Sequence, residues 1–305
     1  MPSAGATAEF ERQRPRLRGL AYRMLGSVAD ADDVLQDAYM RWHGAAEAGV
    51  REPAAWLTTA VTRLCIDRLR AARVEREAYA GPWLPEPWLG DAEAGARPDR
   101  RQDRADDLSI AFLLLLERLA PEERAALLLH DVFELGYPQI AAALEKSEAA
   151  CRQAVHRARE RVRSERRRFA VTNAERRQLL DRFLAATRAG DDAQLLDLLA
   201  PAATLTSDGG GKAWAARKVI HGAGRIARLL LGVARKAPPH LEYVDTMLNG
   251  EPAVVTRIDG RPHATLSIDV EDGRIVAIWR VMNPDKLIAL ENLAPPVTAP
   301  SPGRQ

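Results

Sequence analysis

Residues 138–163 read PQIAAALEKSEAACRQAVHRARERVR, and this stretch predicts two helices separated by a short turn. The first helix begins at Pro138 and ends at Leu144, and the second runs from Glu148 to about Arg168. Between them, Ser147 is suited to cap the second helix, because its hydroxyl can accept a hydrogen bond from a free backbone amide of the first turn. This order of elements is typical of a helix-turn-helix.

The second of these helices has two faces of different chemistry. Residues four or three apart share a face of a helix, which predicts a buried stripe of Cys151, Val155, Ala158 and Val162. A basic face carries Arg152, His156, Arg159 and Arg163, flanked by Gln153 and Arg157. Recognition helices place their N-terminal residues against base edges, and Arg and Gln are good base readers. We therefore predict DNA binding, with a basic helix on a bundle surface as the alternative.

The distribution of charge along the chain agrees with a local DNA-binding surface. The 305 residues include 44 Lys and Arg against 42 Asp and Glu, a formal charge of +2 that excludes a histone-like polycation. Residues 147–169 nevertheless carry 8 basic and 3 acidic side chains, whereas residues 77–110 carry 4 basic and 8 acidic ones. The positive charge is thus concentrated on one predicted helix, behind an acidic connector.

Upstream, residues 8–76 are helical in pattern. A first amphipathic helix has an apolar side and an opposite acidic side that consists of Asp32, Asp33, Gln36, Asp37 and Met40. This side is either a solvated face or a partner surface, since an exposed Met among carboxylates suits a charged interface with an apolar spot. A second helix, from about Pro53 to Arg76, carries Thr59, Arg63 and Arg70 opposite its core stripe, where they could follow phosphates.

The C-terminal block begins as helix and continues as strands. Thr172 and Glu175 have capping-box spacing and open a helix that ends near Ala189, before Gly190. Four strand-like runs follow, separated by Asn249-Gly250, Asp259-Gly260 and Asp272-Gly273. Each of these pairs tolerates positive φ at both positions, as a tight type I′ hairpin requires. Helices followed by a curved antiparallel sheet predict an α+β domain.

Several classes of site are not expected. The two cysteines, Cys65 and Cys151, are far apart in sequence, so neither a disulfide framework nor a structural metal site is predicted. Cys151 is interpreted as a core residue rather than a nucleophile. We also expect no cofactor, no secretory signal and no membrane span, because the apolar run from Ile110 ends at Glu117, far short of roughly 20 residues. These observations together predict a cytoplasmic protein.

Longer stretches of the chain resemble the extracytoplasmic-function sigma factors, the initiation subunits of bacterial RNA polymerase. The similarity is carried by residues 21–38, AYRMLGSVADADDVLQDA, by residues 53–70, PAAWLTTAVTRLCIDRLR, and by residues 119–161. The resemblance implies that residues 8–76 are the domain that binds core polymerase and the −10 element, and that residues 108–169 are the domain that reads the −35 element. It implies that the two all-α domains act in promoter-specific transcription initiation.

The resemblance also implies which side chains would make these contacts. Polymerase would be bound by Asp32, Asp33, Gln36, Asp37 and Met40. The −10 strand would be approached by Trp56, Thr59, Arg63 and Arg70, and the −35 element by Arg152, Gln153, His156, Arg157 and Arg159. One residue departs from the family, because Glu52 precedes Pro53 where many members have Asn, and a carboxylate there is unfavourable near the DNA backbone.

Three short motifs are similar to those of a subgroup with a fused SnoaL-like C-terminal domain. They are Trp83, Leu84, Pro85, Glu86 and Pro87 in the connector, then Asp208, Gly209, Gly210, Gly211 and Lys212, and finally Asn283, Pro284, Asp285, Lys286 and Leu287. The resemblance implies a SnoaL-like cone at 170–293 that regulates the sigma factor in cis. Pro-rich composition predicts a linker at 77–107 and a loose tail at 294–305. A proline-stiffened ribbon loses little entropy on docking, so we expect it to bind the C-terminal domain.

Two other functions remain open at this point. The first is a DNA-binding regulator that responds to a small ligand in the cone, with Trp214, Tyr243 and Trp279 as expected lining residues. The second is a SnoaL-like enzyme with Asp269, His263 and His221 as acid–base candidates. Since no paired carboxylates or His–Asp arrangement stand out, we expect no catalysis.

Overall fold

The computed structural model describes residues 4–90, 108–163 and 171–293. It divides into two compact units, which are described separately below: residues 1–78 with 90–167 form the helical unit, and residues 79–89 with 168–305 form the C-terminal unit. The predicted tail at 294–305 and the greater part of the predicted linker, 91–107, lie outside the described residues. Among the described residues, no helix is long and apolar enough to cross a membrane.

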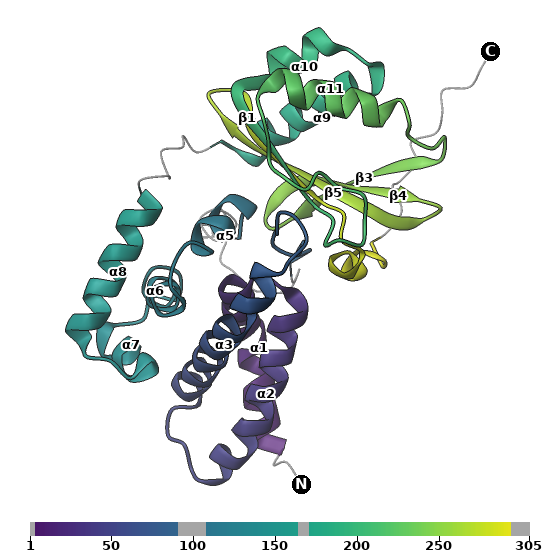
Figure 1. Ribbon diagram of the computed structural model, residues 1–305. Coiled ribbons are helices and arrows are strands. Elements are labelled where there is room, and N and C mark those ends of the chain that lie inside the picture. The colour runs from purple at the N-terminus through teal and green to yellow at the C-terminus, as the bar shows by residue number, and fades with distance from the viewer. Residues whose placement is uncertain (1–3, 91–107, 164–170, 294–305) are drawn as a thin grey trace. The chain divides into compact units, whose positions relative to one another are not determined.

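The helical unit begins with three long helices, α1 (Ala4–Leu25), α2 (Val28–Glu47) and α3 (Pro53–Glu77). Each packs against the other two (Figure 1). Ser27 caps α2, because its hydroxyl accepts a hydrogen bond from the Asp30 amide at 3.2 Å. Apolar side chains at helical spacing, such as Val34, Leu35 and Leu57, are buried between the helices. The faces that stay exposed are therefore the acidic face of α2 and the basic face of α3.

The rest of the helical unit contains the predicted helix-turn-helix. Its elements are α5 (Ile110–Leu116), α6 (Pro121–Leu127), the π-helical turn η2 (Leu128–Val132), α7 (Tyr137–Leu144) and α8 (Glu148–Arg163). The turn between α7 and α8 is made by Glu145, whose φ of 54° is left-handed, and the Ala150 amide donates to the Ser147 hydroxyl at 3.2 Å. Cys151, Val155 and the rest of the predicted stripe are buried, so the two-helix layout and its core face are confirmed.

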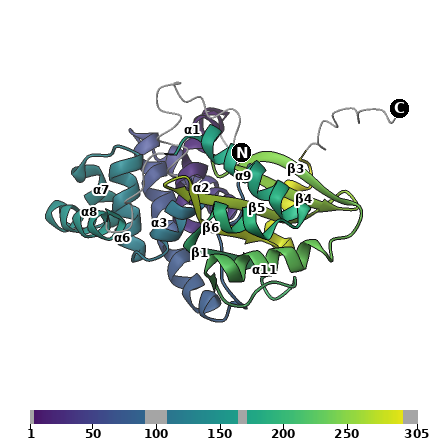
Figure 2. The same cartoon turned by 90° about the horizontal axis from the view of Figure 1, so that it is seen from above.

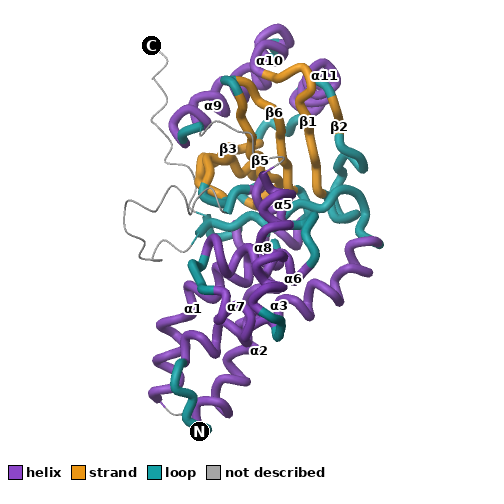
Figure 3. Tube along the Cα trace, turned by 90° about the vertical axis from the view of Figure 1, so that its left-hand side faces the viewer, coloured by secondary structure: helices purple, strands orange, loops and turns teal. Residues whose placement is uncertain are grey.

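The C-terminal unit is a six-stranded sheet with helices on one face (Figures 1 and 2). The helices are α9 (Asn173–Ala189), α10 (Asp192–Leu198) and α11 (Ala223–Ala234), with short 3-10 turns η3 (Pro284–Lys286) and η4 (Ile288–Leu290) near the end. The strands are β1 (Leu199–Asp208), β2 (Ile220–His221), β3 (Leu241–Leu248), β4 (Glu251–Ile258), β5 (Arg261–Glu271) and β6 (Arg274–Val281). Helix and strand are well separated in this unit (Figure 3).

The order of the strands corrects one expectation. The sheet runs β2-β1-β6-β5-β4-β3, and β1 pairs with β6 in parallel while the other neighbours are antiparallel. The sheet is therefore mixed, not purely antiparallel as its hairpin signals predicted. The reason is that β1 pairs with β6, a strand far away in the sequence, and turn residues do not indicate a pairing of this kind. Strands β2 and β3 form two edges, so the sheet stays open.

Local signals in the C-terminal unit predicted its elements well. Thr172 and Glu175 form the expected capping box at the start of α9, and Gly190 ends that helix at a φ of 75°. The hairpins β3–β4, β4–β5 and β5–β6 turn on Asn249-Gly250, Asp259-Gly260 and Asp272-Gly273, and every one of these six residues has a φ between 51° and 75°. These angles confirm the hairpin prediction.

Candidate functional sites: two helix faces and a docked strap

The first candidate surface is the acidic face of α2. Asp32, Asp33, Gln36, Asp37 and Met40 are all exposed, and Met40 keeps 67% of its surface accessible. Asp33, Gln36 and Asp37 also line a hollow beside Leu64 and Arg68 of α3. Asp32 differs from the others, because Arg18 of α1 donates to its two carboxylate oxygens at 2.7 and 3.0 Å. Asp33, Gln36, Asp37 and Met40 thus form a surface of carboxylates around one apolar side chain.

The second candidate surface is the exposed face of α3, and part of it is occupied within the helical unit. The Arg63 guanidinium donates to the carbonyl oxygens of Ala142 and Ala143 at 2.9 Å, and it pairs with Glu145 at 2.9 Å. These acceptors lie at the C-terminal end of α7, where a helix presents unpaired carbonyls and a partial negative charge. The helix that was predicted to approach the −10 strand therefore contacts the helix-turn-helix.

A second arginine of the same face is also paired. Arg70 donates to Glu122 of α6 at 2.5 Å. Although burial raises the pKa of Glu122, the hydrogen bond from Arg70 lowers that pKa overall. Thr59 remains half-buried, and the Trp56 ring packs 5.5 Å from the Trp42 ring. The structure brings all four predicted residues to one face of α3 and engages the two arginines with the second half of the unit.

The third candidate surface is the basic face of α8. Arg152, Gln153 and His156 are exposed near its N-terminal end, and the Arg152 guanidinium lies 5.2 Å from the centre of the Tyr137 ring. Further along, Arg157 donates to Glu123 at 3.0 Å, and Arg159 donates to both oxygens of Asp131 at 3.0 and 2.5 Å. The α8 face therefore has an open end and a distal part held by carboxylates of the same module.

The fourth site joins residues that lie far apart in the sequence. We call residues 79–89 the strap, because this segment belongs to the C-terminal unit and is buried there at Leu84, Pro85, Glu86, Pro87 and Trp88. The carboxylate of Asp208, itself fully buried, accepts from the Tyr79 hydroxyl at 2.6 Å and from the Leu84 amide at 2.8 Å. Burial, together with the neighbouring Asp208 carboxylate, raises the pKa of Tyr79.

Lys286 completes this hub. Its ammonium group donates to Asp208 at 2.8 Å and to the Leu84 carbonyl at 2.5 Å, and it lies 4.3 Å from the centre of the Trp83 ring. The Asn283 side chain donates to the Tyr79 hydroxyl at 3.0 Å. Residues of all three predicted motifs thus meet at one buried carboxylate.

The glycines of the second motif make this close approach possible. Gly210 has a φ of 58°, and a side chain there would collide with Asn283. A side chain on Gly209 would come within 2.5 Å of the Ala213 carbonyl oxygen. Lys212, in contrast, forms an exposed ion pair with Asp285 at 2.5 Å, with more than half of each side chain accessible. The motif therefore has a buried part at Asp208 and an exposed part at Lys212.

Two strap contacts were missed by reasoning from the sequence. Tyr79 lies just before the recognised motif, and Asn249 was noted only as a turn residue. The Asn249 amide donates to the Trp88 carbonyl at 2.8 Å, and its side chain accepts from the Trp88 amide at 3.2 Å. A signal for Tyr79 was available, since an aromatic side chain beside a proline-rich apolar ribbon extends that ribbon.

The acid–base candidates of the C-terminal unit do not come together. His263 lines a cavity between the sheet and the helices, whereas Asp269 is buried beside Arg176, 3.5 Å away, and His221 is exposed on β2. Trp214 and Tyr243 line the cavity as expected, and Trp279 does not. Within the described ranges, no group of His, Cys, Asp and Glu side chains is placed to hold a metal ion. Ion pairing therefore holds the one buried carboxylate candidate as a structural residue.

The sequence of the helical unit matches two known families of protein domains. Residues 10–74 match the Sigma-70 region 2 family, and residues 109–162 match the Sigma-70, region 4 family. The chain is 37% identical to the ECF RNA polymerase sigma factor SigJ of Mycobacterium tuberculosis (strain ATCC 25618 / H37Rv) over 290 residues, which cover 92% of each protein. It is 31% identical to the probable ECF RNA polymerase sigma factor SigI of the same strain, over 92% of this chain and 94% of that one.

The similarity extends to a solved structure. The crystal structure of Mycobacterium tuberculosis SigJ superposes with a TM-score of 0.72 and 36% identity. The match covers 92% of this chain and 98% of that one, so it includes the C-terminal sheet as well as the helices.

Proposed function

Because the chain belongs to the family of extracytoplasmic-function RNA polymerase sigma factors, we propose that its helical unit brings core polymerase to promoter DNA and that its C-terminal unit regulates this step in cis through the strap. The observation that carries the first part is the match to both sigma regions within one full-length similarity. The second part is supported by the buried hub, where three distant motifs meet at Asp208.

Polymerase binding is assigned to the acidic face of α2. Asp33, Asp37 and Met40 are exposed, and among the described residues no hydrogen bond or ion pair holds these three side chains. An apolar contact ringed by carboxylates suits a basic partner surface, which steers association and fixes the orientation. Asp32, which is held by Arg18, would shape this face more than it would bind directly.

Promoter binding is assigned to the faces of α3 and α8. On α8, the exposed Arg152, Gln153 and His156 would contact −35 base edges, because they occupy the end of the helix that enters the major groove. On α3, Arg63 and Arg70 would contact the −10 strand only after they leave Glu145 and Glu122. The arrangement in the structure therefore corresponds to a closed form of the helical unit.

Transcription from a cognate promoter by core polymerase and the full chain tests this assignment. The double variant Asp33→Lys/Asp37→Lys should lose at least about tenfold in initiation, because like charges across an interface are repulsive. The matched control Glu242→Lys/Glu291→Lys reverses two exposed charges of the C-terminal unit, outside α2, and should retain activity. A protein that binds its promoter and acts normally with the acidic face reversed would instead be a ligand-responsive regulator that needs no contact with polymerase.

A further inference from the structure

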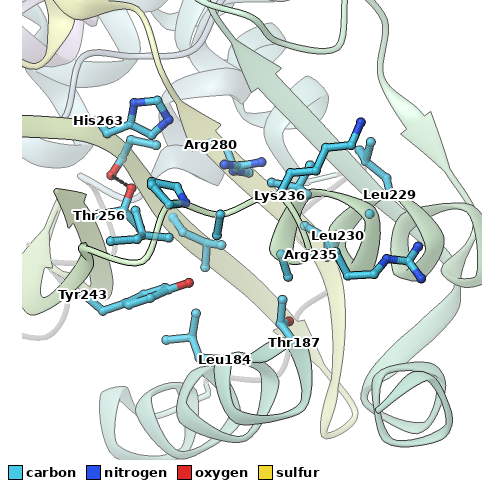
Figure 4. Close-up of a pocket in the computed structure, with 18 of the residues that line it drawn as sticks. Leu184, Thr187, Leu229, Leu230, Arg235, Lys236, Tyr243, Thr256, His263 and Arg280 are labelled. Carbon is cyan, nitrogen blue, oxygen red and sulfur yellow. Dashed lines mark hydrogen bonds between the residues drawn. The ribbon is translucent and has the colours of Figure 1, made fainter. Parts of the chain in front are cut away.

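A cavity of about 790 Å³ lies in the C-terminal unit, between the sheet and helices α9 and α11 (Figure 4). It continues the apolar core toward one end of the sheet. Its walls are largely hydrocarbon, and they include Phe183, Leu184, Leu230, Val233, Ile258 and Leu266. A cavity of this size can enclose most of the surface of a small organic molecule.

The charged residues around this cavity have a single sign. Arg228, Arg235, Lys236 and Arg280 line it, and the described lining includes no Asp or Glu. An apolar cavity with only cationic charges favours an anionic ligand over a neutral or a cationic one.

Arg280 is the cation that matters most, because of its place in β6. Side chains two apart on a strand share a face, so Arg280 points the same way as Ile278, which belongs to the buried core. Among the described residues, none forms a hydrogen bond or an ion pair with its guanidinium. Burial lowers the pKa of Arg280, so the folded protein bears a cost for keeping this charge inside.

Polar groups accompany this arginine inside the cavity. The Tyr243 hydroxyl reaches into the same space as Arg280 (Figure 4). The centre of the Tyr243 ring lies 4.0 Å from the guanidinium of Arg188. His263 also lines the cavity, and burial and the charge of Arg280 lower its pKa. The Thr256 hydroxyl is already engaged, since it donates to the Ala264 carbonyl at 3.2 Å. Arg280 and Tyr243 thus offer donors at the inner end of an apolar chamber.

We propose that this cavity binds an amphipathic organic monocarboxylate, whose carboxylate pairs with Arg280 and whose apolar body fills the space between α9, α11 and the sheet. Arg fits this role because its planar donors match a carboxylate in a bidentate pair. The proposal concerns binding alone and stands whether or not the ligand alters transcription.

Calorimetric titration of the full chain with three ligands of equal chain length tests this proposal. Decanoate should bind at least about tenfold more tightly than decanol or decylamine, because only the carboxylate can pair with the Arg280 guanidinium that lines the cavity. Arg280→Met, which keeps the length and removes the charge, should abolish this preference and leave decanoate and decanol equal. Arg225→Met, an exposed position on α11 outside the cavity lining, should keep the preference.

A site-specific signal keeps the test independent of folding effects. The imidazole resonances of His263 should shift on addition of decanoate and stay in place on addition of decylamine. Equal affinity of the wild-type chain for decanoate and decanol, absence of binding by all three ligands, or an undiminished preference for decanoate in Arg280→Met would each overturn the proposal.

Discussion

At the scale of single residues, Asp208 shows how one buried charge can hold distant segments together. Its carboxylate has no exposed surface, yet it accepts from the strap at Tyr79 and Leu84 and pairs with Lys286. A buried carboxylate is stable only when charges and donors surround it. The strap supplies some of these donors, so its docking stabilises the buried Asp208 carboxylate.

Asp208→Asn should therefore loosen the strap. The isosteric amide leaves the Lys286 ammonium, 11% exposed, without its anion, and breaking one partner of a buried pair costs about 3–5 kcal/mol of stability. Thiol labelling of Leu84→Cys reports the exposure of the strap, because Cys65 and Cys151 are both buried. Labelling should become at least about 100-fold faster in the Asp208→Asn background, as the lost free energy of about 3–5 kcal/mol requires.

A matched variant separates the buried hub from the surface of the same motif. Lys212→Ala removes an ion pair whose two side chains are each 57% exposed, so stability should change by less than about 1 kcal/mol. If both variants expose the strap equally, Asp208 does not hold it.

His263 provides a second prediction at this scale. Its folded pKa lies below the ordinary value of 6.5 because of burial and the positive charge of Arg280. The stability that goes with neutral His263 is present above pH 6.5 and is lost as the pH falls through that value toward the folded pKa. In Arg280→Met, NMR titration should give a higher pKa for His263, and less stability should be lost in acid. An unchanged pKa would show that the two side chains do not interact.

Individual residues could be predicted when a motif marked them. The three short motifs pointed to Asp208 and Lys286, but the sequence does not reveal that both meet at Tyr79, because that contact spans 129 residues. Arg280 did leave a signal, since it falls at an inward position of an alternating strand. We did not predict its role because the neighbouring Ile278 and Val281 are typical of a strand that only contributes to the hydrophobic core.

At the scale of elements, α3 and the helix-turn-helix hold each other through side chains that promoter DNA would also use. Arg70 binds Glu122, and Arg63 covers the C-terminal carbonyls of α7. DNA phosphates and these acceptors would compete for the same guanidinium groups. The contacts are partly exposed, so each is weak enough to exchange.

Glu122→Gln should therefore favour promoter binding. One partly exposed ion pair stabilises the closed form by about 0.2–1 kcal/mol. Its removal lowers the free-energy cost of freeing Arg70 by that amount, which predicts a gain of about 1.5- to 5-fold in affinity for a −10 strand. Fluorescence anisotropy of a labelled strand with the full chain measures this gain. Glu75→Gln, at an exposed position on α3 itself, should show no gain, and a weaker affinity in Glu122→Gln would argue against competition.

Elements and hairpin pairings with strong local signals were predicted correctly, and the pairings between segments distant in the sequence were not. The cap at Ser147, the capping box at Thr172 and the three hairpin turns depend on neighbouring residues, which is why pattern alone identified them. The parallel pairing of β1 with β6 and the packing of α3 on α7 join distant segments, whose association depends on the shapes of whole surfaces.

At the scale of the whole molecule, the chain passes between its two units three times, near residues 78, 89 and 167. The first 90 residues therefore contribute α1, α2 and α3 to one unit and the strap to the other. If the chain were cut between the strap and α5, each of the two fragments would contain segments of both units. Each fragment would therefore pack against the other in both units. The assembly should thus survive a single cut.

A protease site engineered within residues 91–107 tests this. After cleavage, the two fragments should elute together on size exclusion, because the strap contacts and the contacts of α3 with α6 and α7 both hold them. Asp208→Asn should promote their separation by removing one of these two attachments. Immediate separation of the wild-type fragments would show that the covalent connection, and not packing, holds these two parts of the chain together.

The position of the strap in the chain has one more consequence. Helix α3 ends at Glu77 and the strap begins at Tyr79, so a docked strap leaves Ala78 as the whole tether on that side. A released strap would leave the chain passing between the units only near residue 167, because residues 78 and 90 both belong to the helical unit. Release of the strap by a substitution at the hub would in this way enlarge the volume that α3 can explore, and it would lower the local concentration at which the two units meet.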